Sequence, residues 1–272
     1  MATIADYQRV CEQAARAGGD VLRDWKGRFA VREKGPADLV TEADLASQEA
    51  IREILLGAFP GHGFLAEEGF LADKNARLAR QGDDLRWIVD PLDGTTNYVH
   101  GVPNYAVSIA LERGGAPLVG TVYDPSADEC FSAAAGHGAT CNGEALRVSD
   151  VGRLSHAMVA VSFSAKVDRG DQEIGDFIEV MLKTQATRRM GSSALNLCYV
   201  AAGRFDAYWA TTTKIWDIAA GALLVREAGG EITSIDGGPF HLERPQFIAA
   251  ATKALHGELR ELLSRSRSSI TA

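Results

Sequence analysis

The segment that decides the fold reads, from residue 87 to residue 97, Trp-Ile-Val-Asp-Pro-Leu-Asp-Gly-Thr-Thr-Asn. Its apolar start predicts a buried strand that ends at Asp90, because Pro91 has no amide proton to continue the ladder of hydrogen bonds. Asp93 and Gly94 then turn the chain toward a helix that is expected to begin at residues 95–96. The segment therefore predicts a strand, a tight turn and a helix N-terminus in immediate succession.

Oxygen atoms and amides that suit phosphate chemistry converge in this turn. Asp90, Asp93 and the carbonyl of Leu92 are hard oxygen ligands of the kind that Mg²⁺ prefers. The amides of Gly94 and Thr95 are expected to point toward a bound phosphate group. The spacing alone is equally compatible with a plain strand-to-helix turn capped by aspartate, since Asp-Gly turns are common.

Two other segments contribute carboxylates. Glu67 and Glu68 follow the short apolar run 64–65, and Asp217 precedes an apolar helix expected over 218–225. Paired glutamates usually face solvent, and an aspartate at the start of a helix is usually a cap. Neither segment is diagnostic by itself, so their value lies in occurring together with Asp90 and Asp93.

Charge and composition exclude several classes of function. The 272 residues are 46% hydrophobic and 24% charged, as in an ordinary globular protein, and 28 basic against 36 acidic residues give a net charge of −8. This balance argues against binding to nucleic acid or to an anionic membrane. No apolar run approaches the roughly 18 residues of a membrane span, and the N-terminus lacks the features of a signal peptide. We expect a cytoplasmic protein whose four cysteines, with no CxxC pair, are reduced and structural.

The apolar periodicity predicts two parts that differ in the order of their helices and strands. Helices are expected over 3–26 and 41–59, the second with Thr41 as its N-cap, followed by a mainly antiparallel sheet with strands over 86–89, 105–111, 118–123 and 130–134. Beyond residue 150, strands near 158–163, 205–209, 232 and 247 alternate with helices over 172–184, 193–202, 218–228 and from 255. Residues 1–150 are therefore expected to form an α+β half with most metal ligands. Residues 151–272 are expected to form an α/β half.

Four motifs in order closely resemble those of the inositol monophosphatase family of magnesium-dependent, lithium-sensitive phosphatases. The family's Asp-Pro-Ile-Asp-Gly-Thr-Thr-Asn pattern occurs over 90–97 with Leu92 for Ile, and its Trp-Asp-x-Ala-Ala-Gly pattern occurs whole over 216–221. The pattern Asp-x-Val-Thr-x-x-Asp occurs over 38–44, and Gly-Glu-Glu occurs over 66–68 with Ala66 for Gly.

The resemblance implies a five-layer α-β-α-β-α sandwich, with the elements of substrate specificity in residues 151–272, and a homodimer. It also implies a phosphomonoesterase that uses two or three Mg²⁺ ions, for which Mn²⁺ can substitute. It assigns the activation of water to Asp44, Thr95 and Glu67. It assigns metal binding to Glu67, Glu68, Asp90, the carbonyl of Leu92, Asp93 and Asp217. It assigns substrate contacts to Asp93, Gly94, Thr95, Thr96, Gly191, Ser192, Ser193, the position of Ala210, and Asp217.

One departure from the family pattern bears on the substrate. The family's polyol-contacting glutamate is Ala210 here, with Thr211–Thr213 and Lys214 beside it. Inositol monophosphate remains the first expectation. Histidinol phosphate, fructose 1,6-bisphosphate and nucleotide 3',5'-bisphosphate remain alternatives within the family, and Lys214 either favours a second anionic group or simply faces solvent. A protein of another class, a catalytically silent binder of metal or phosphate, is the remaining alternative, and Lys34 receives no role.

The proposed pocket is physically consistent without the resemblance. Six carboxylates brought together would repel one another and would repel a phosphate ester, and divalent cations remove both problems. Water activated at such a site can attack phosphorus directly, so no side chain is required as a covalent nucleophile. The expected partner is a small phosphorylated molecule.

Overall fold

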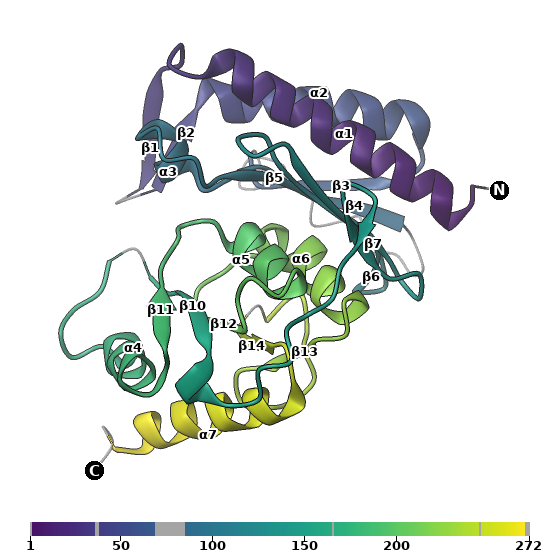
Figure 1. The fold of residues 1–272 in the computed structure, drawn as a ribbon. Helices are drawn as coiled ribbons and strands as arrows, with labels where there is room; N and C mark the ends of the chain where they lie inside the picture. The colour runs from purple at the N-terminus through teal and green to yellow at the C-terminus, as the bar shows by residue number, and fades with distance from the viewer. Residues whose placement is uncertain (1, 36–37, 69–84, 165, 245, 270–272) are drawn as a thin grey trace.

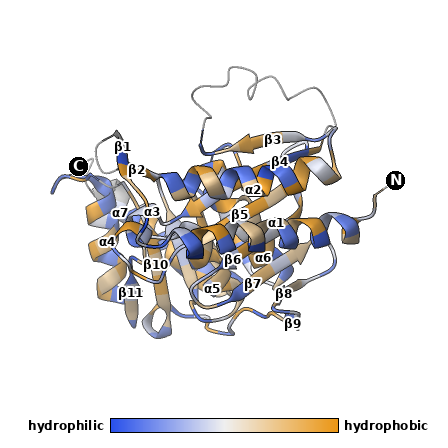
Figure 2. Ribbon diagram, turned by 90° about the horizontal axis from the view of Figure 1, so that it is seen from above, coloured by the Kyte–Doolittle hydropathy of each residue, from blue (hydrophilic) through white to orange (hydrophobic). Residues whose placement is uncertain are grey.

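The computed structural model describes residues 2–35, 38–68, 85–164, 166–244 and 246–269. Helices α1 (Ile4–Trp25) and α2 (Glu42–Ala58) lie side by side and form its first layer (Figures 1 and 2). Both begin at a threonine: Thr3 Oγ1 accepts from the amide of Asp6, and Thr41 Oγ1 accepts from the amides of Ala43 and Asp44. These caps satisfy amides that have no partner inside the helix. The two expected helices and the Thr41 cap are confirmed.

The second layer is a seven-stranded sheet in the order β3-β4-β5-β6-β7-β8-β9. Its strands are β3 (Gly63–Ala66), β4 (Leu85–Asp93), β5 (Ala106–Arg113), β6 (Ala116–Asp124), β7 (Glu129–Ala134), β8 (Ala139–Cys141) and β9 (Glu144–Ala145). Within these described strands, β3 and β4 are the one parallel pair, so the prediction of a mainly antiparallel sheet is confirmed.

Strand β4 departs from the prediction at Pro91. The strand continues to Asp93, which pairs with Ala106, while Asp90 pairs with Ser108. Three steps along β4 thus match two steps along β5, which is a β-bulge. Pairing can resume after Pro91 because the bulge removes Pro91 and Leu92 from the ladder. The expectation that pairing stops at Pro91 was wrong.

The third layer consists of α5 (Ser193–Ala201) and α6 (Ile215–Glu227), which are enclosed between the two sheets (Figure 1). Glycines permit the close approach of this layer to its neighbours. A Cβ atom added at Gly221 would lie 2.5 Å from Leu197 Cβ, and one added at Gly120 of β6 would lie 2.8 Å from Ala220 Cα. Helix α6 begins three residues before the predicted start, so Asp217 lies inside its first turn.

A second sheet and two outer helices complete five layers, and the predicted α-β-α-β-α fold is confirmed. The sheet has the order β11-β10-β12-β14-β13, with β10 parallel to β11 and β12. Its strands are β10 (Met158–Ser162), β11 (Ala186–Arg188), β12 (Ala207–Ala210), β13 (Glu231–Ser234) and β14 (Phe247–Ala250). The outer helices are α4 (Gln172–Lys183) and α7 (Lys253–Ser269). The division at residue 150 stays a prediction.

Smaller elements lie outside these layers. Strands β1 (Val31–Gly35) and β2 (Asp38–Thr41) form an antiparallel pair, α3 (Thr95–Val99) follows β4, and a 3₁₀ turn covers Leu154–His156. None of the helices in the described part of the chain combines the length and the apolar character needed to cross a membrane.

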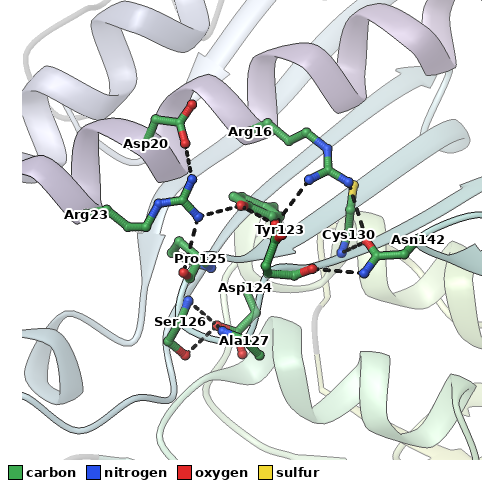
Figure 3. Close-up of polar contacts among 11 residues, drawn as sticks. Arg16, Asp20, Arg23, Tyr123, Asp124, Pro125, Ser126, Ala127, Cys130 and Asn142 are labelled. Carbon is green, nitrogen blue, oxygen red and sulfur yellow. Dashed lines mark hydrogen bonds and ion pairs between the residues drawn. The ribbon is translucent and has the colours of Figure 1, made fainter.

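A polar network fastens α1 to the turn after β6 (Figure 3). Arg23 Nη1 donates to the hydroxyl of Tyr123 over 2.7 Å, and that hydroxyl donates to Asp128 Oδ1 over 2.8 Å. Arg16 lies 3.3 Å from the same carboxylate oxygen and also donates to Asn142 over 3.4 Å. Gln8 Nε2 also donates to Ser132 Oγ of β7 over 3.0 Å. These directional contacts add to the apolar packing and fix how α1 lies across the sheet.

Candidate metal and phosphate site

Three carboxylates meet where β4 ends and α6 begins. One oxygen from each of Asp90, Asp93 and Asp217 lies within 4.8 Å of the other two. The β-bulge brings Asp90 and Asp93 of one strand to the same site, and the first turn of α6 supplies Asp217. The side chains of Asp90 and Asp93 are buried, whereas Asp217 is partly buried. These spacings allow one cation to contact all three residues.

Backbone donors orient each carboxylate. The amide of Leu92 donates to Asp90 Oδ1 over 3.0 Å, and the amide of Lys214 donates to Asp217 Oδ2 over 2.8 Å. Asp93 Oδ2 accepts from the amide of Ala194 over 2.7 Å and from the hydroxyl of Ser192. Asp93 therefore also caps the start of α5, which connects the end of β4 to the third layer.

The electrostatics of the cluster fit a bound cation. Burial, followed by repulsion from Glu67, Asp93 and Asp217, raises the pKa of Asp90 well above its usual range. Burial raises the pKa of Asp93 to about 6 against the opposing hydrogen bonds from Ser192 and Ala194. Burial and the charge of Asp93 likewise raise the pKa of Asp217. A divalent cation removes this repulsion, and carboxylate oxygens are the ligands that Mg²⁺ prefers.

Glu67 and Glu68 occupy different surroundings after β3. The Glu67 amide donates to the carbonyl of Val89 over 3.1 Å, which holds residue 67 beside β4, and its charge raises the pKa of Asp90 and Asp217. The carbonyl of Glu68 accepts from Gln48 Nε2 over 3.0 Å, and its side chain is buried. The structure thus brings Glu67 within electrostatic reach of the aspartates, while neither glutamate belongs to the group within 4.8 Å.

The side chains of Asp44 and Thr95, which the resemblance assigns together to the activation of water, lie close to each other. Thr95 Oγ1 lies 3.5 Å from Asp44 Oδ1 and 3.0 Å from the carbonyl oxygen of Leu92. Asp44 is held in place because its Oδ2 accepts from the amide and the hydroxyl of Thr41. Thr95 begins α3 after Gly94, whose φ of 92° favours glycine; a Cβ there would lie 3.0 Å from the Asn104 carbonyl oxygen.

A cavity of about 580 Å³ adjoins Gly94 and Thr95. Five of the predicted substrate contacts line it, namely Gly94, Thr95, Thr96, Gly191 and Ser193. The other four, Asp93, Ser192, Ala210 and Asp217, are not in the lining; Ser192 and Ala210 are fully buried, and Ser192 contacts Asp93. Gly191 has a φ of 97° and follows Met190, whose carbonyl accepts from Asn97 Nδ2 over 2.8 Å. Asn97 thereby joins α3 to the loop before α5.

Several lining residues escaped the sequence analysis, namely Leu39, Asn97, Ser162, Phe163, Arg189 and Met190. Leu39 and Asn97 lie inside quoted motifs, at positions to which no role was assigned. The others come from strand ends and loops, where no local pattern distinguishes them. Lys214 is exposed and lines a neighbouring cavity of about 760 Å³. Thr212 and Thr213 line both cavities. The side chain of Lys34 lies outside the described part of the structure.

Comparisons with known proteins show the family to which this chain belongs. The model of the inositol monophosphatase family matches residues 5–268. An inositol-1-monophosphatase of Mesorhizobium japonicum is 42% identical over 257 residues, which cover 92% of each chain. The crystal structure of the extragenic suppressor protein suhB from Bartonella henselae has a TM-score of 0.86 at 39% identity, over 94% of this chain and 98% of that one.

A third relative is described with ligands. An IMPase/NADP phosphatase complexed with Mg²⁺ and phosphate has a TM-score of 0.78 at 28% identity, over 90% of this chain and 89% of that one. The family match spans nearly the whole chain, and the acidic cluster suits a metal-dependent member. This chain therefore belongs to the inositol monophosphatase family and is a phosphoric monoester hydrolase.

Proposed function

We propose that this enzyme is a Mg²⁺-dependent phosphomonoesterase that hydrolyses a small phosphorylated polyol, with inositol monophosphate as the first candidate. The observation that carries the proposal is the cluster of Asp90, Asp93 and Asp217 within 4.8 Å, next to a cavity lined by Gly94 and Thr95. A phosphate ester needs cations to approach three carboxylates, and that arrangement supplies their ligands.

The metal ligands would come from three segments: Glu67 and Glu68 after β3, then Asp90, the Leu92 carbonyl and Asp93 at the end of β4, then Asp217 in α6. Two or three ions would be held, and Mn²⁺ would substitute. When bound, Mg²⁺ supplies positive charge that acidifies water and stabilises the transition state of phosphoryl transfer. Asp93 would orient both the ions and the start of α5 through its bonds to Ser192 and Ala194.

Thr95 and Asp44 would direct the attacking water. The Thr95 hydroxyl has one proton and two acceptors within 3.5 Å, the Leu92 carbonyl oxygen at 3.0 Å and Asp44 Oδ1 at 3.5 Å. In the proposed step, the lone pairs of Thr95 Oγ1 accept from water and Asp44 receives the proton that water loses, by way of Thr95. The water oxygen bonds to phosphorus as the ester P–O bond breaks, and the leaving alkoxide takes a proton from solvent.

The phosphoryl oxygens would be held by amides at the start of α3, those of Gly94, Thr95 and Thr96. The leaving group would occupy the rest of the cavity, where Ser162, Ser193, Thr212 and Thr213 offer hydroxyls to a polyol. Holding both ends of the ester aligns the water, phosphorus and leaving oxygen. Because Ala210 supplies no carboxylate, histidinol phosphate, fructose 1,6-bisphosphate and nucleotide 3',5'-bisphosphate remain candidate substrates.

The proposal is tested by measuring phosphate release from inositol monophosphate and from the three alternative substrates. Each is measured with Mg²⁺, and with or without Li⁺. We expect Mg²⁺-dependent release from at least one substrate, and inhibition by Li⁺ as in the family. Absence of release from all of them would favour a catalytically silent binder of metal or phosphate. We also propose that the protein is cytoplasmic and forms a homodimer; light scattering on the purified protein would check the homodimer.

A further inference from the structure

The substrate cavity is asymmetric in charge. Arg189, in the loop between β11 and α5, is the one residue with a formal charge among the described residues that line it. The remaining lining residues of the leaving-group side offer hydroxyls, backbone groups and the apolar side chains of Phe163 and Met190. In the proposed binding mode, the ester phosphate would lie against the amides of Gly94 and Thr95. Arg189 is then the charged side chain of the lining that the leaving group would meet.

The Arg189 guanidinium is already held in position. Its Cζ atom lies 4.5 Å from the centre of the Phe163 ring, which is the geometry of a cation–π contact. Its Nη2 lies 3.4 Å from the carbonyl oxygens of Phe163 and Ser164, which are weak contacts at that distance. The side chain is exposed, and Nε and Nη1 make no hydrogen bond to the described residues. Those two donors remain available to a ligand, and little side-chain freedom is lost when they bind one.

A carboxylate that contacts the same loop, that of Glu173, is engaged by other donors. Glu173 Oε2 accepts from the amide of Ser164 over 3.2 Å, and Glu173 Oε1 accepts from the hydroxyl of Thr211. No ion pair joins Arg189 to a carboxylate among the described residues, and Ala210 supplies none. The positive charge of Arg189 is thus balanced by backbone carbonyls and an aromatic face, which leaves it able to attract an anion.

We propose that Arg189 binds a second anionic group, a phosphate or a carboxylate, carried by the leaving group of the substrate. The proposal rests on the phosphatase function proposed above and deepens it: doubly anionic phosphomonoesters such as fructose 1,6-bisphosphate gain affinity from Arg189. Esters with a neutral leaving group gain nothing, and esters with an ammonium group such as histidinol phosphate are repelled. Arg189, rather than Lys214, is the cation that sets this preference.

The test compares kcat and KM of three substrates, fructose 1,6-bisphosphate, glycerol 2-phosphate and histidinol phosphate, at saturating Mg²⁺ and fixed ionic strength. In Arg189→Ala we expect KM for the bisphosphate to rise about tenfold or more, because a charge-assisted contact is lost. The KM for glycerol 2-phosphate and all kcat values should stay within about twofold, since Arg189 belongs neither to the acidic cluster nor to the amides proposed to hold the phosphoryl oxygens. Arg189→Lys should retain part of the preference, and Arg189→Glu should reverse it toward histidinol phosphate.

Arg188→Ala is the matched control, because Arg188 is exposed, donates to the carbonyl of Thr187 over 3.0 Å and does not line the cavity. Light scattering on each variant reports its oligomeric state. If Arg189→Ala leaves the ratio of the three specificity constants unchanged, the proposal is wrong; an equal loss on all substrates with an altered oligomer would assign Arg189 to a subunit contact instead. Hydrolysis of glycerol 2-phosphate by the wild type keeps this failure distinct from a failure of the phosphatase function.

Discussion

Asp93 has two tasks at once, because it belongs to the acidic cluster and also caps α5 through Ser192 and Ala194. Asp93→Asn keeps the shape of the side chain but removes the negative charge. We expect kcat to fall on the order of 100-fold or more, even when Mg²⁺ is raised to saturation. Phosphate release measured across a Mg²⁺ titration checks this. Asp20→Asn on the exposed side of α1 is the control, and a wild-type kcat for Asp93→Asn would contradict the assignment.

His256 in α7 makes the stability of the protein depend on pH. Its ring is buried, its Nε2 lies 2.9 Å from Thr233 Oγ1, and burial lowers the pKa of the imidazole below its usual 6.5. The unfolded chain therefore takes up a proton near pH 6.5, while the folded chain does so only at lower pH. Above pH 6.5 this group does not lower the free energy of unfolding. As the pH drops from 6.5 toward the pKa of the folded state, the free energy of unfolding falls by at most about 1.4 kcal/mol per pH unit for one proton.

His256→Gln should remove this dependence while retaining a hydrogen bond to Thr233. Urea unfolding at pH 7.5 and pH 5.5 gives the free energies of unfolding of both proteins. We expect the difference between the two pH values to be smaller in the variant than in the wild type, with the exposed His137→Gln as the control. Equal differences in all three proteins would show that His256 keeps the same pKa on folding.

Some residues of the site could be predicted from the sequence and others could not. Asp90, Asp93 and Asp217 belong to motifs whose family resemblance placed them in one pocket, and their oxygens do lie within 4.8 Å. Arg189 belongs to no such motif, and its importance depends on the absence of other charges from a cavity assembled from six separate segments. Because that absence is a property of the folded surface, no local pattern of residues could predict it.

Among the elements, α6 packs closely against α5 and against strands of both sheets. Gly221 permits the close approach of α6 to α5. An alanine there would place a Cβ atom 2.5 Å from Leu197 Cβ in α5, so one of the two helices would have to move. We expect Gly221→Ala to lower the free energy of unfolding by about 1–3 kcal/mol. Gly57 of α2 has no atom within 4 Å of an added Cβ, so Gly57→Ala should be neutral or stabilise the protein by up to about 1 kcal/mol. Urea unfolding of both variants decides, and a neutral Gly221→Ala would mean that α5 shifts at no cost.

Helices and strands were predicted best where the apolar pattern extends over many residues. The 22 residues of α1 repeat an apolar face several times, and Thr41 marks the start of α2 through its hydroxyl. Strands β8 and β11 have three residues each, which is too short for an alternating pattern to appear. The continuation of β4 beyond Pro91 depends on a bulge against β5, and that register is decided by the partner strand.

At the scale of the whole molecule, the acidic site draws its residues from two layers. β4 of the first sheet supplies Asp90 and Asp93, while Asp217 comes from α6, which packs between the two sheets. The site is therefore complete only when all these layers are assembled. Any cation that binds it favours the folded state over the unfolded chain, because the unfolded chain cannot bring the three carboxylates together.

Removing the metal should consequently destabilise the protein. Removing one carboxylate should reduce the stabilisation that Mg²⁺ provides. At 100 times its Kd, Mg²⁺ should stabilise the wild type by about 2.7 kcal/mol relative to protein in EDTA, which corresponds to a Tm increase of roughly 5–10 °C. Asp217→Asn can still accept from the amide of Lys214 but no longer repels Asp93. Its Tm in EDTA should exceed that of the wild type, and Mg²⁺ should raise it much less. Thermal unfolding with NaCl at matched ionic strength separates binding from screening, and an equal Mg²⁺ response in both proteins would place the cation elsewhere.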